Sequence, residues 1–132
     1  MDHAWASSVL DNMPKTVLQS LFSTRARLVD VNCCSCGEQL AMVTEAANGP
    51  LLTVWSPSAN SPAGAGGETL WAMASGPVPK EARVPVRCFE HGYGVVEPTA
   101  LHEKVVRYRS EGVGQVLPVE VGLDGPQRAL TR

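Results

Sequence analysis

The sequence predicts an α+β fold, with a small antiparallel sheet, helices at the N-terminus and one helix near the C-terminus. Apolar residues recur at helical spacing near both ends of the chain and alternate with a period of two between them. Glycine and proline, 12 and 10 of 132 residues, divide the middle into short segments. Since 44% of residues are hydrophobic and the formal net charge is only −2, we expect one folded unit with a thin core.

Residues 1–26 are expected to form an N-terminal helical region of two elements. The first covers residues 2–12 and ends at Met13-Pro14. The second begins after Asn12 as N-cap, with Pro14 in the first turn, where its missing N–H costs little. Its apolar residues follow at helical spacing, namely Val17, Leu18, Leu21 and Phe22.

Residues 27–97 are expected to form the sheet. From Arg27 the pattern alternates, with Val29, Val31 and Cys33 on one side of a strand. Further strands are predicted at 39–45, 51–55, 70–74, 83–88 and 93–96. The segment 56–69 consists almost entirely of small and turn-forming residues, which predicts a flexible loop.

Residues 98–121 are expected to add a helix and a short strand. The helix is predicted over 98–110, because Pro98 lies near its first position and Gly112 just past its end. The strand, within 113–121, is expected at an edge because Pro118 cannot donate a ladder hydrogen bond. Residues 122–132 show no periodicity and are expected to be a tail.

The most specific signal is a pair of similar turns, each between two predicted strands. The first has the pattern C-x-x-C-G and the second the pattern C-x-x-H-G. Two ligands three residues apart at a hairpin tip can hold half a tetrahedron, and the following glycine allows a left-handed turn. Together the two turns would supply three thiolates and one imidazole, a set that suits zinc. The candidate ligands are Cys33, Cys36, Cys88 and His91.

On these residues the chain resembles the zinc-ribbon, or paired zinc-knuckle, superfamily over 27–97. The resemblance implies one structural Zn²⁺ bound between two hairpin tips. The chain departs from a minimal ribbon in the long insert between Cys36 and Cys88, which holds the 56–69 loop. Four ligands leave no open position, which favours a structural over a catalytic metal. Zinc ribbons serve many roles, so the resemblance informs fold more than function.

Four other interpretations of the cysteines remain open. They are unrelated buried cysteines, a disulfide framework, a redox pair at Cys33 and Cys36, and an iron–sulfur cluster. The N-terminus lacks a basic signal-peptide region, which favours a cytoplasmic protein with reduced thiols. Strands flank Cys33 and Cys36 on both sides, whereas a thioredoxin-like pair precedes a helix. Cys34 is expected to be a bystander thiol.

The chain has no G-x-S-x-G, P-loop, H-E-x-x-H, G-x-G-x-x-G or zinc-deaminase pattern, so we expect no enzyme. It has no membrane-length apolar run, so we expect no membrane protein. We expect a non-enzymatic structural-zinc protein that acts as a protein-interaction module or an accessory subunit of a larger assembly. The first alternative is a nucleic-acid-binding zinc ribbon in transcription or translation, and the second is a thiol redox protein. Phosphate contacts in the first alternative would come from Arg25, Arg27, Arg87, Lys104, Arg107 and Arg109, because the chain has no global basic excess.

Overall fold

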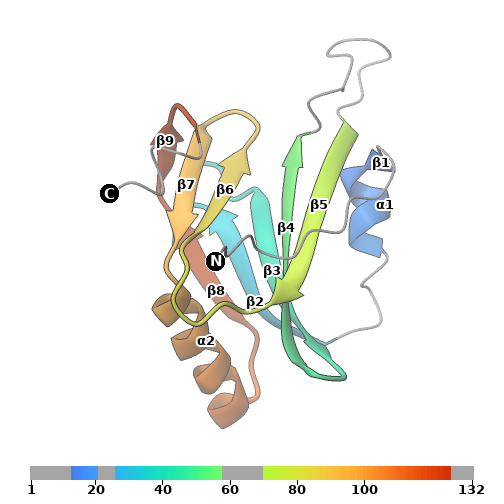
Figure 1. The fold of residues 1–132 in the computed structure, drawn as a ribbon, viewed down its shortest axis with the longest axis vertical. Helices are drawn as coiled ribbons and strands as arrows, with labels where there is room; N and C mark the ends of the chain where they lie inside the picture. Colours follow the sequence, from blue (N-terminus) through green and yellow to red (C-terminus); the bar gives the residue numbers. More distant parts are fainter. Residues whose placement is uncertain (1–12, 21–25, 58–69, 126–132) are drawn as a thin grey trace.

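The computed structural model describes residues 13–20, 26–57 and 70–125. These residues form two β-sheets and two helices, and most of them lie in strands (Figure 1). The predicted α+β fold, with one small antiparallel sheet and N-terminal helices, is therefore wrong. Local periodicity located most of the strands, but it carried no information about how distant strands would pair and divide into sheets.

The larger sheet has six strands. Their order across the sheet is β1 (Met13–Pro14), β5 (Leu70–Pro77), β4 (Gly49–Pro57), β3 (Gln39–Ala46), β2 (Arg27–Cys33) and β8 (Gln115–Val119). All neighbours are antiparallel except β2 and β8, which are parallel. A parallel pair requires a crossover, and the chain that returns to β8 includes the helix α2 (Pro98–Glu111).

The N-terminal region differs from the prediction. Met13 and Pro14 form β1 and pair with Trp71 and Leu70 of β5, so this segment adds to a sheet. Pro14 is tolerated because β1 is an edge strand, where a missing donor breaks no ladder. The helix α1 (Lys15–Ser20) follows and has six residues. The rest of the predicted helical region, residues 1–12 and 21–25, lies outside the described residues.

The strand β8 lies at the edge of the sheet, as Pro118 predicted. The backbone N–H of Cys34 donates to the oxygen of Val119 at 3.0 Å, so Val119 faces β2. Because backbone groups alternate along a strand, Pro118 faces the outer edge. There its missing N–H removes no hydrogen bond from the ladder.

The smaller sheet contains β6 (Val84–Cys88), β7 (Gly92–Val96) and β9 (Val121–Leu123). Strand β9 includes two residues of the predicted tail, so that prediction is wrong at 122 and 123. The chain leaves the larger sheet after β8 and joins the smaller one at β9, with Glu120 between them. Gly94 of β7 permits this crossing, because a Cβ there would overlap the backbone oxygen of Glu120.

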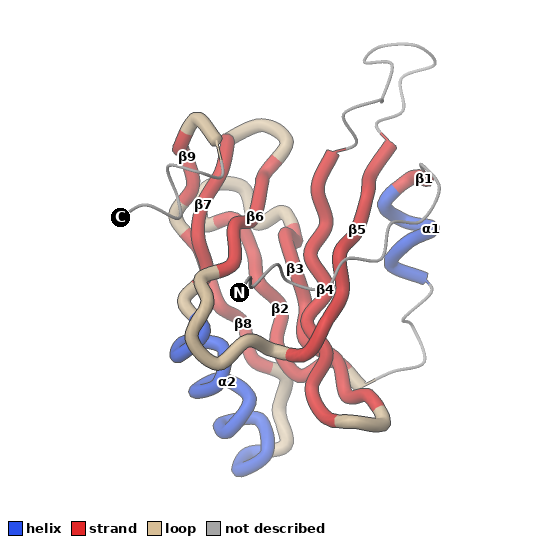
Figure 2. Tube along the Cα trace, viewed as in Figure 1, coloured by secondary structure: helices blue, strands red, loops and turns tan. Residues whose placement is uncertain are grey.

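The central strands of the larger sheet pack on both faces. On β4, Leu52 packs into a core shared with the smaller sheet and α2, whereas Trp55 packs into a second core with Leu18 of α1. The two helices accordingly lie on opposite sides of the molecule (Figure 2). Neither described helix is long and apolar enough to cross a lipid bilayer.

The helix α2 agrees closely with its prediction. Leu101 and Val105 are buried in the core between the sheets. Gly112 ends the helix in a left-handed conformation with φ of 73°, and its N–H donates to the oxygen of Tyr108 at 2.6 Å. These contacts fix α2 against β2 and β8, at the end of the sheet away from the cysteine turns (Figure 1).

Candidate metal centre

The first cysteine turn joins β2 to β3. The N–H of Gly37 donates to the oxygen of Cys33 at 2.8 Å, and the N–H of Cys33 donates to the oxygen of Glu38 at 2.8 Å. The N–H of Ser35 also points at the sulfur of Cys33, at 3.4 Å. Gly37 has φ of 79°, the left-handed conformation expected of a glycine after the second ligand. These bonds close the turn tightly around the sulfur of Cys33.

The second turn joins β6 to β7. Cys88 ends β6 and pairs in register with Gly92, so that His91 lies within the turn itself. Gly92 has φ of 99°, and a Cβ there would lie 3.0 Å from the backbone oxygen of Leu123 in β9. Glycine is therefore required at this position both by its conformation and by the close approach of a neighbouring strand.

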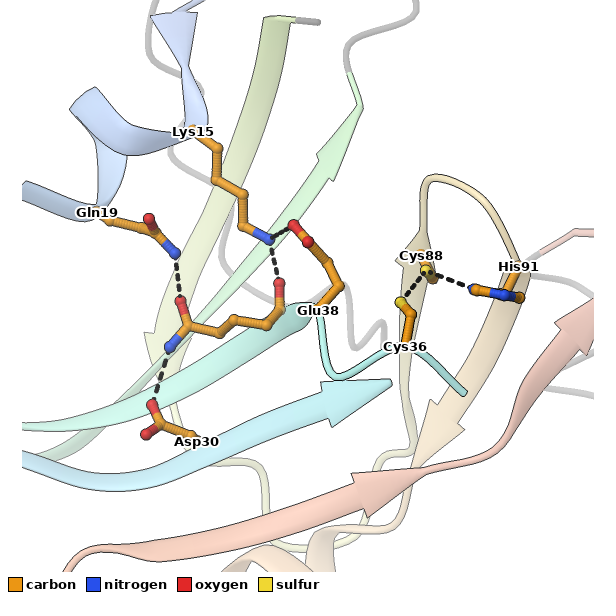
Figure 3. Close-up of polar contacts among 8 residues, drawn as sticks. Lys15, Gln19, Asp30, Cys36, Glu38, Cys88 and His91 are labelled. Carbon is orange, nitrogen blue, oxygen red and sulfur yellow. Dashed lines mark hydrogen bonds and ion pairs between the residues drawn. The ribbon is translucent and has the colours of Figure 1, made fainter. Parts of the chain in front are cut away.

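The structure brings the four proposed ligands together. The sulfur and imidazole nitrogen atoms of Cys33, Cys36, Cys88 and His91 all lie within 4.8 Å of one another. The sulfur atoms of Cys36 and Cys88 are 3.6 Å apart, and Nδ1 of His91 lies 3.4 Å from the sulfur of Cys88 and 3.8 Å from that of Cys33. Three of these side chains are drawn in Figure 3.

The separations of 3.4, 3.6 and 3.8 Å fit the edges of a metal-centred tetrahedron. With Zn–S bonds of about 2.3 Å and Zn–N bonds of about 2.0 Å, tetrahedral angles give edges of about 3.8 Å between sulfurs and about 3.5 Å between sulfur and nitrogen. The sulfur atoms of Cys36 and Cys88 are too far apart for a disulfide, and all four cysteines are free thiols. The arrangement can therefore hold a metal ion.

The electrostatics of the cluster also favour a cation. The N–H of Glu38 lowers the pKa of Cys36, but desolvation and the nearby thiols of Cys88 and Cys33 together raise it to about 11. Burial raises the pKa of Cys33, but hydrogen bonds from the backbone of Cys36 and Ser35 outweigh it and lower that pKa. Sulfurs this close can all ionise only when a positive charge lies between them.

The remaining candidate residues lie elsewhere. Cys34 is exposed and lies outside the cluster, as expected of a bystander. The basic residues proposed for phosphate contacts come from β2, β6 and α2, and Arg25 lies outside the described residues. Three have partners: Arg27 lies 3.7 Å from Asp30, Arg87 5.2 Å from the Tyr93 ring, and Arg109 3.1 Å from Glu45. Lys104 and Arg107 lie on α2, and nucleic-acid contact stays a prediction.

The sequence did not reveal a polar network beside the first turn. Lys15 of α1 forms an ion pair with Glu38 and donates to the backbone oxygen of Gln39 (Figure 3). Gln39 in turn bonds to Gln19 and Asp30. Lys15 and Glu38 are 23 positions apart, so no local spacing could have indicated the pair.

Comparison with known proteins gives no family assignment. No protein-family model matches the chain, and no curated protein or solved structure matches it. The resemblance to zinc ribbons therefore rests on the two turns alone. In this fold the turns belong to two different sheets.

Proposed function

We propose that this chain is a non-enzymatic structural-zinc protein. The observation that supports the proposal is the meeting of four ligand atoms within 4.8 Å, two from each of two hairpins. Three cysteines and one histidine fill a tetrahedron, so no position is left open for a substrate or an activated water. With three thiolates and a neutral imidazole, the zinc-bound site carries about one net negative charge by counting ligand charges.

The zinc ion would join the two sheets. Cys33 and Cys36 lie at one end of the β2–β3 hairpin, and Cys88 and His91 lie at one end of the β6–β7 hairpin. The sheets already share a core, and four metal–ligand bonds would fix that packing at the end where the turns meet. Metal sites of this kind contribute directly to folding free energy.

The role that fits a closed metal site is that of a cytoplasmic protein-interaction module or an accessory subunit of a larger assembly. Apolar side chains exposed on α2 and around β8 support this role. Val106, Val113 and Val116 are 67%, 60% and 51% exposed. Size-exclusion chromatography and co-purification of tagged protein from native extract would test it. We expect a stable complex, and a strictly monomeric species with no partner would contradict the role.

Metal analysis of the intact protein tests the centre itself. We expect one zinc ion per chain in protein purified without chelators. Replacement by Co²⁺ should give the intense visible absorption of a tetrahedral, thiolate-rich site. Tightly bound iron would instead favour the iron–sulfur interpretation. Metal-free protein with reactive thiols at Cys33 and Cys36 would favour the thiol redox protein.

A further inference from the structure

The helix α1 is too short to be stable by itself. It has six residues, and isolated helices of this length do not persist in water. Its apolar anchor is Leu18, which is fully buried against the second core. Among the described residues, Lys15 and Gln19 add polar contacts to this apolar one. The position of α1 therefore depends on the residues that these two side chains meet.

Lys15 contacts the segment that follows the first ligand turn. Its ammonium group binds the carboxylate of Glu38 and the backbone oxygen of Gln39, directly after Gly37. The backbone oxygen of Glu38 accepts the N–H of Cys33 at 2.8 Å. Lys15 thus binds Glu38, the residue whose backbone oxygen bonds to the proposed ligand Cys33.

Lys15 is also connected to the second ligand turn. Its Nζ lies 4.7 Å from the centre of the Trp71 ring, within the range of a cation–π contact. The Trp71 ring lies 6.4 Å from the ring of Phe89, at an interplanar angle of 54°. Phe89 follows Cys88 within the turn that carries His91. One ammonium group therefore connects to both halves of the metal centre.

The geometry restrains this ammonium group strongly. The side chain of Lys15 is 10% exposed, whereas that of Glu38 is 41% exposed. Gln39 is held in turn by the amide of Gln19 at 2.7 Å and the carboxylate of Asp30 at 2.8 Å (Figure 3). The network therefore links α1 to the start of β3 and to β2 and keeps the first turn in one orientation.

We propose that Lys15 is a positioning residue for the metal centre, so that metal binding and the docking of α1 on the sheet stabilise each other. This inference rests on the proposed function. A bound metal fixes both turns, and so holds Glu38 in place for Lys15 and Phe89 in place beside Trp71, the ring that Lys15 contacts. By thermodynamic linkage, a docked α1 must strengthen metal binding by the same factor. Residues that orient metal ligands commonly change metal affinity by about 10- to 100-fold.

Competition titration of Zn²⁺ against a chromophoric chelator tests the inference on the full chain. We expect Lys15→Met to bind Zn²⁺ about 10- to 100-fold more weakly than wild type. Lys80→Met is the matched control, because Lys80 is an exposed lysine in the loop between β5 and β6. Its affinity should equal that of wild type. Equal affinities in Lys15→Met and wild type would overturn the inference.

A second variant covers the case in which Lys15→Met does not fold. Glu38→Gln removes the ion pair from its more exposed side, and we expect it to weaken Zn²⁺ binding in the same direction. When both variants fold, the loss of Zn²⁺-binding free energy in the double variant should be smaller than the sum of the losses in the two single variants, because the two residues act through one contact. Unchanged affinity in Glu38→Gln, or fully additive losses, would contradict the linkage.

These measurements separate the inference from the function on which it rests. If wild-type protein does not bind one Zn²⁺ per chain, the metal centre itself is refuted. Wild-type protein that binds one Zn²⁺, with variants of equal affinity, would leave the centre intact and refute only the role of Lys15.

Discussion

The two ligand turns have nearly the same local pattern but are supported in different ways. Backbone hydrogen bonds close the first turn, and a side chain from a distant element adds to them, since Lys15 binds Glu38 and the backbone oxygen of Gln39. At the second turn a neighbouring backbone approaches closely, because a Cβ on Gly92 would lie 3.0 Å from the oxygen of Leu123 in β9. Each turn has one buried cysteine at the end of a strand, Cys33 in the first and Cys88 in the second.

This difference indicates where each turn can tolerate change. A side-chain network can be weakened gradually by single substitutions, whereas closely packed backbone excludes any added atom. We therefore expect substitutions near the first turn to weaken the centre gradually, and substitutions that add atoms near the second turn to destabilise the fold more sharply. Four experiments test how the two turns differ.

The largest effect is expected from removing a buried ligand. Cys88→Ser should lose tight Zn²⁺ binding and the stability that the metal supplies, which is about 4 kcal/mol at a free metal concentration a thousand times Kd. Cys34→Ser is the control, since Cys34 lies outside the cluster and should keep one zinc per chain. Metal analysis and thermal unfolding with and without chelator measure both. Unchanged zinc content and Tm in Cys88→Ser would exclude the proposed centre.

The next effect concerns the tight backbone beside the second turn. Gly94→Ala should destabilise the fold by about 1–3 kcal/mol, because its Cβ would overlap the oxygen of Glu120. At Gly114 the nearest atom would lie 3.7 Å away, so Gly114→Ala should leave stability nearly unchanged. Urea unfolding of the two variants makes the comparison. Equal free energies of unfolding would mean that the crossing at Glu120 is not closely packed.

Substituting the glycine of each turn compares how closely the two turns are packed. Gly37→Ala and Gly92→Ala should each cost about 1–2 kcal/mol, because both positions are left-handed. Gly92→Ala should cost more, since only its Cβ would also press on a neighbouring strand, at 3.0 Å from the oxygen of Leu123. Chemical unfolding in the presence of zinc measures the difference. A larger loss at Gly37 would reverse this comparison.

The smallest expected effect is the change in Zn²⁺ affinity for each unit of pH. A thiol with a pKa of about 11, as for Cys36, is protonated at neutral pH and must lose that proton when it binds metal. Affinity for Zn²⁺ should therefore fall about tenfold for each unit that pH decreases between 8 and 6, from this thiol alone. Chelator competition at several pH values measures the slope. A flat profile would show that Cys36 is not a ligand.

Much of the local structure could be read from the sequence. Alternating residues located β2, the tight turn after it located β3, and Pro98 with Gly112 located α2 nearly to the residue. The ligand pairs were also recognisable, because both members of each pair lie within four positions of each other. The error at β1 arose because Pro14 is compatible with both a helix start and an edge strand, and pairing with β5 decided between them.

The long-range arrangement could not be read in this way. Nothing in the local pattern of β8 indicated a parallel pairing with β2, and nothing near Lys15 indicated Glu38 as its partner. Both depend on residues far apart in the chain, whose association is governed by burial of whole faces and not by spacing. Gly94 offered a weak signal, because a glycine inside a strand often marks a close approach of backbone.

Local sequence patterns located most of the strands, the C-terminal helix and the two pairs of ligands, because each of these depends on neighbours within a few residues. That the two ligand pairs belong to two separate sheets, and that α1 is connected to both pairs, follows from the packing of segments far apart in the chain. The central strands of the larger sheet pack on both faces, with the smaller sheet and α2 against one face and α1 against the other. That packing brings Cys36 next to Cys88 and places Lys15 beside the turns that carry them.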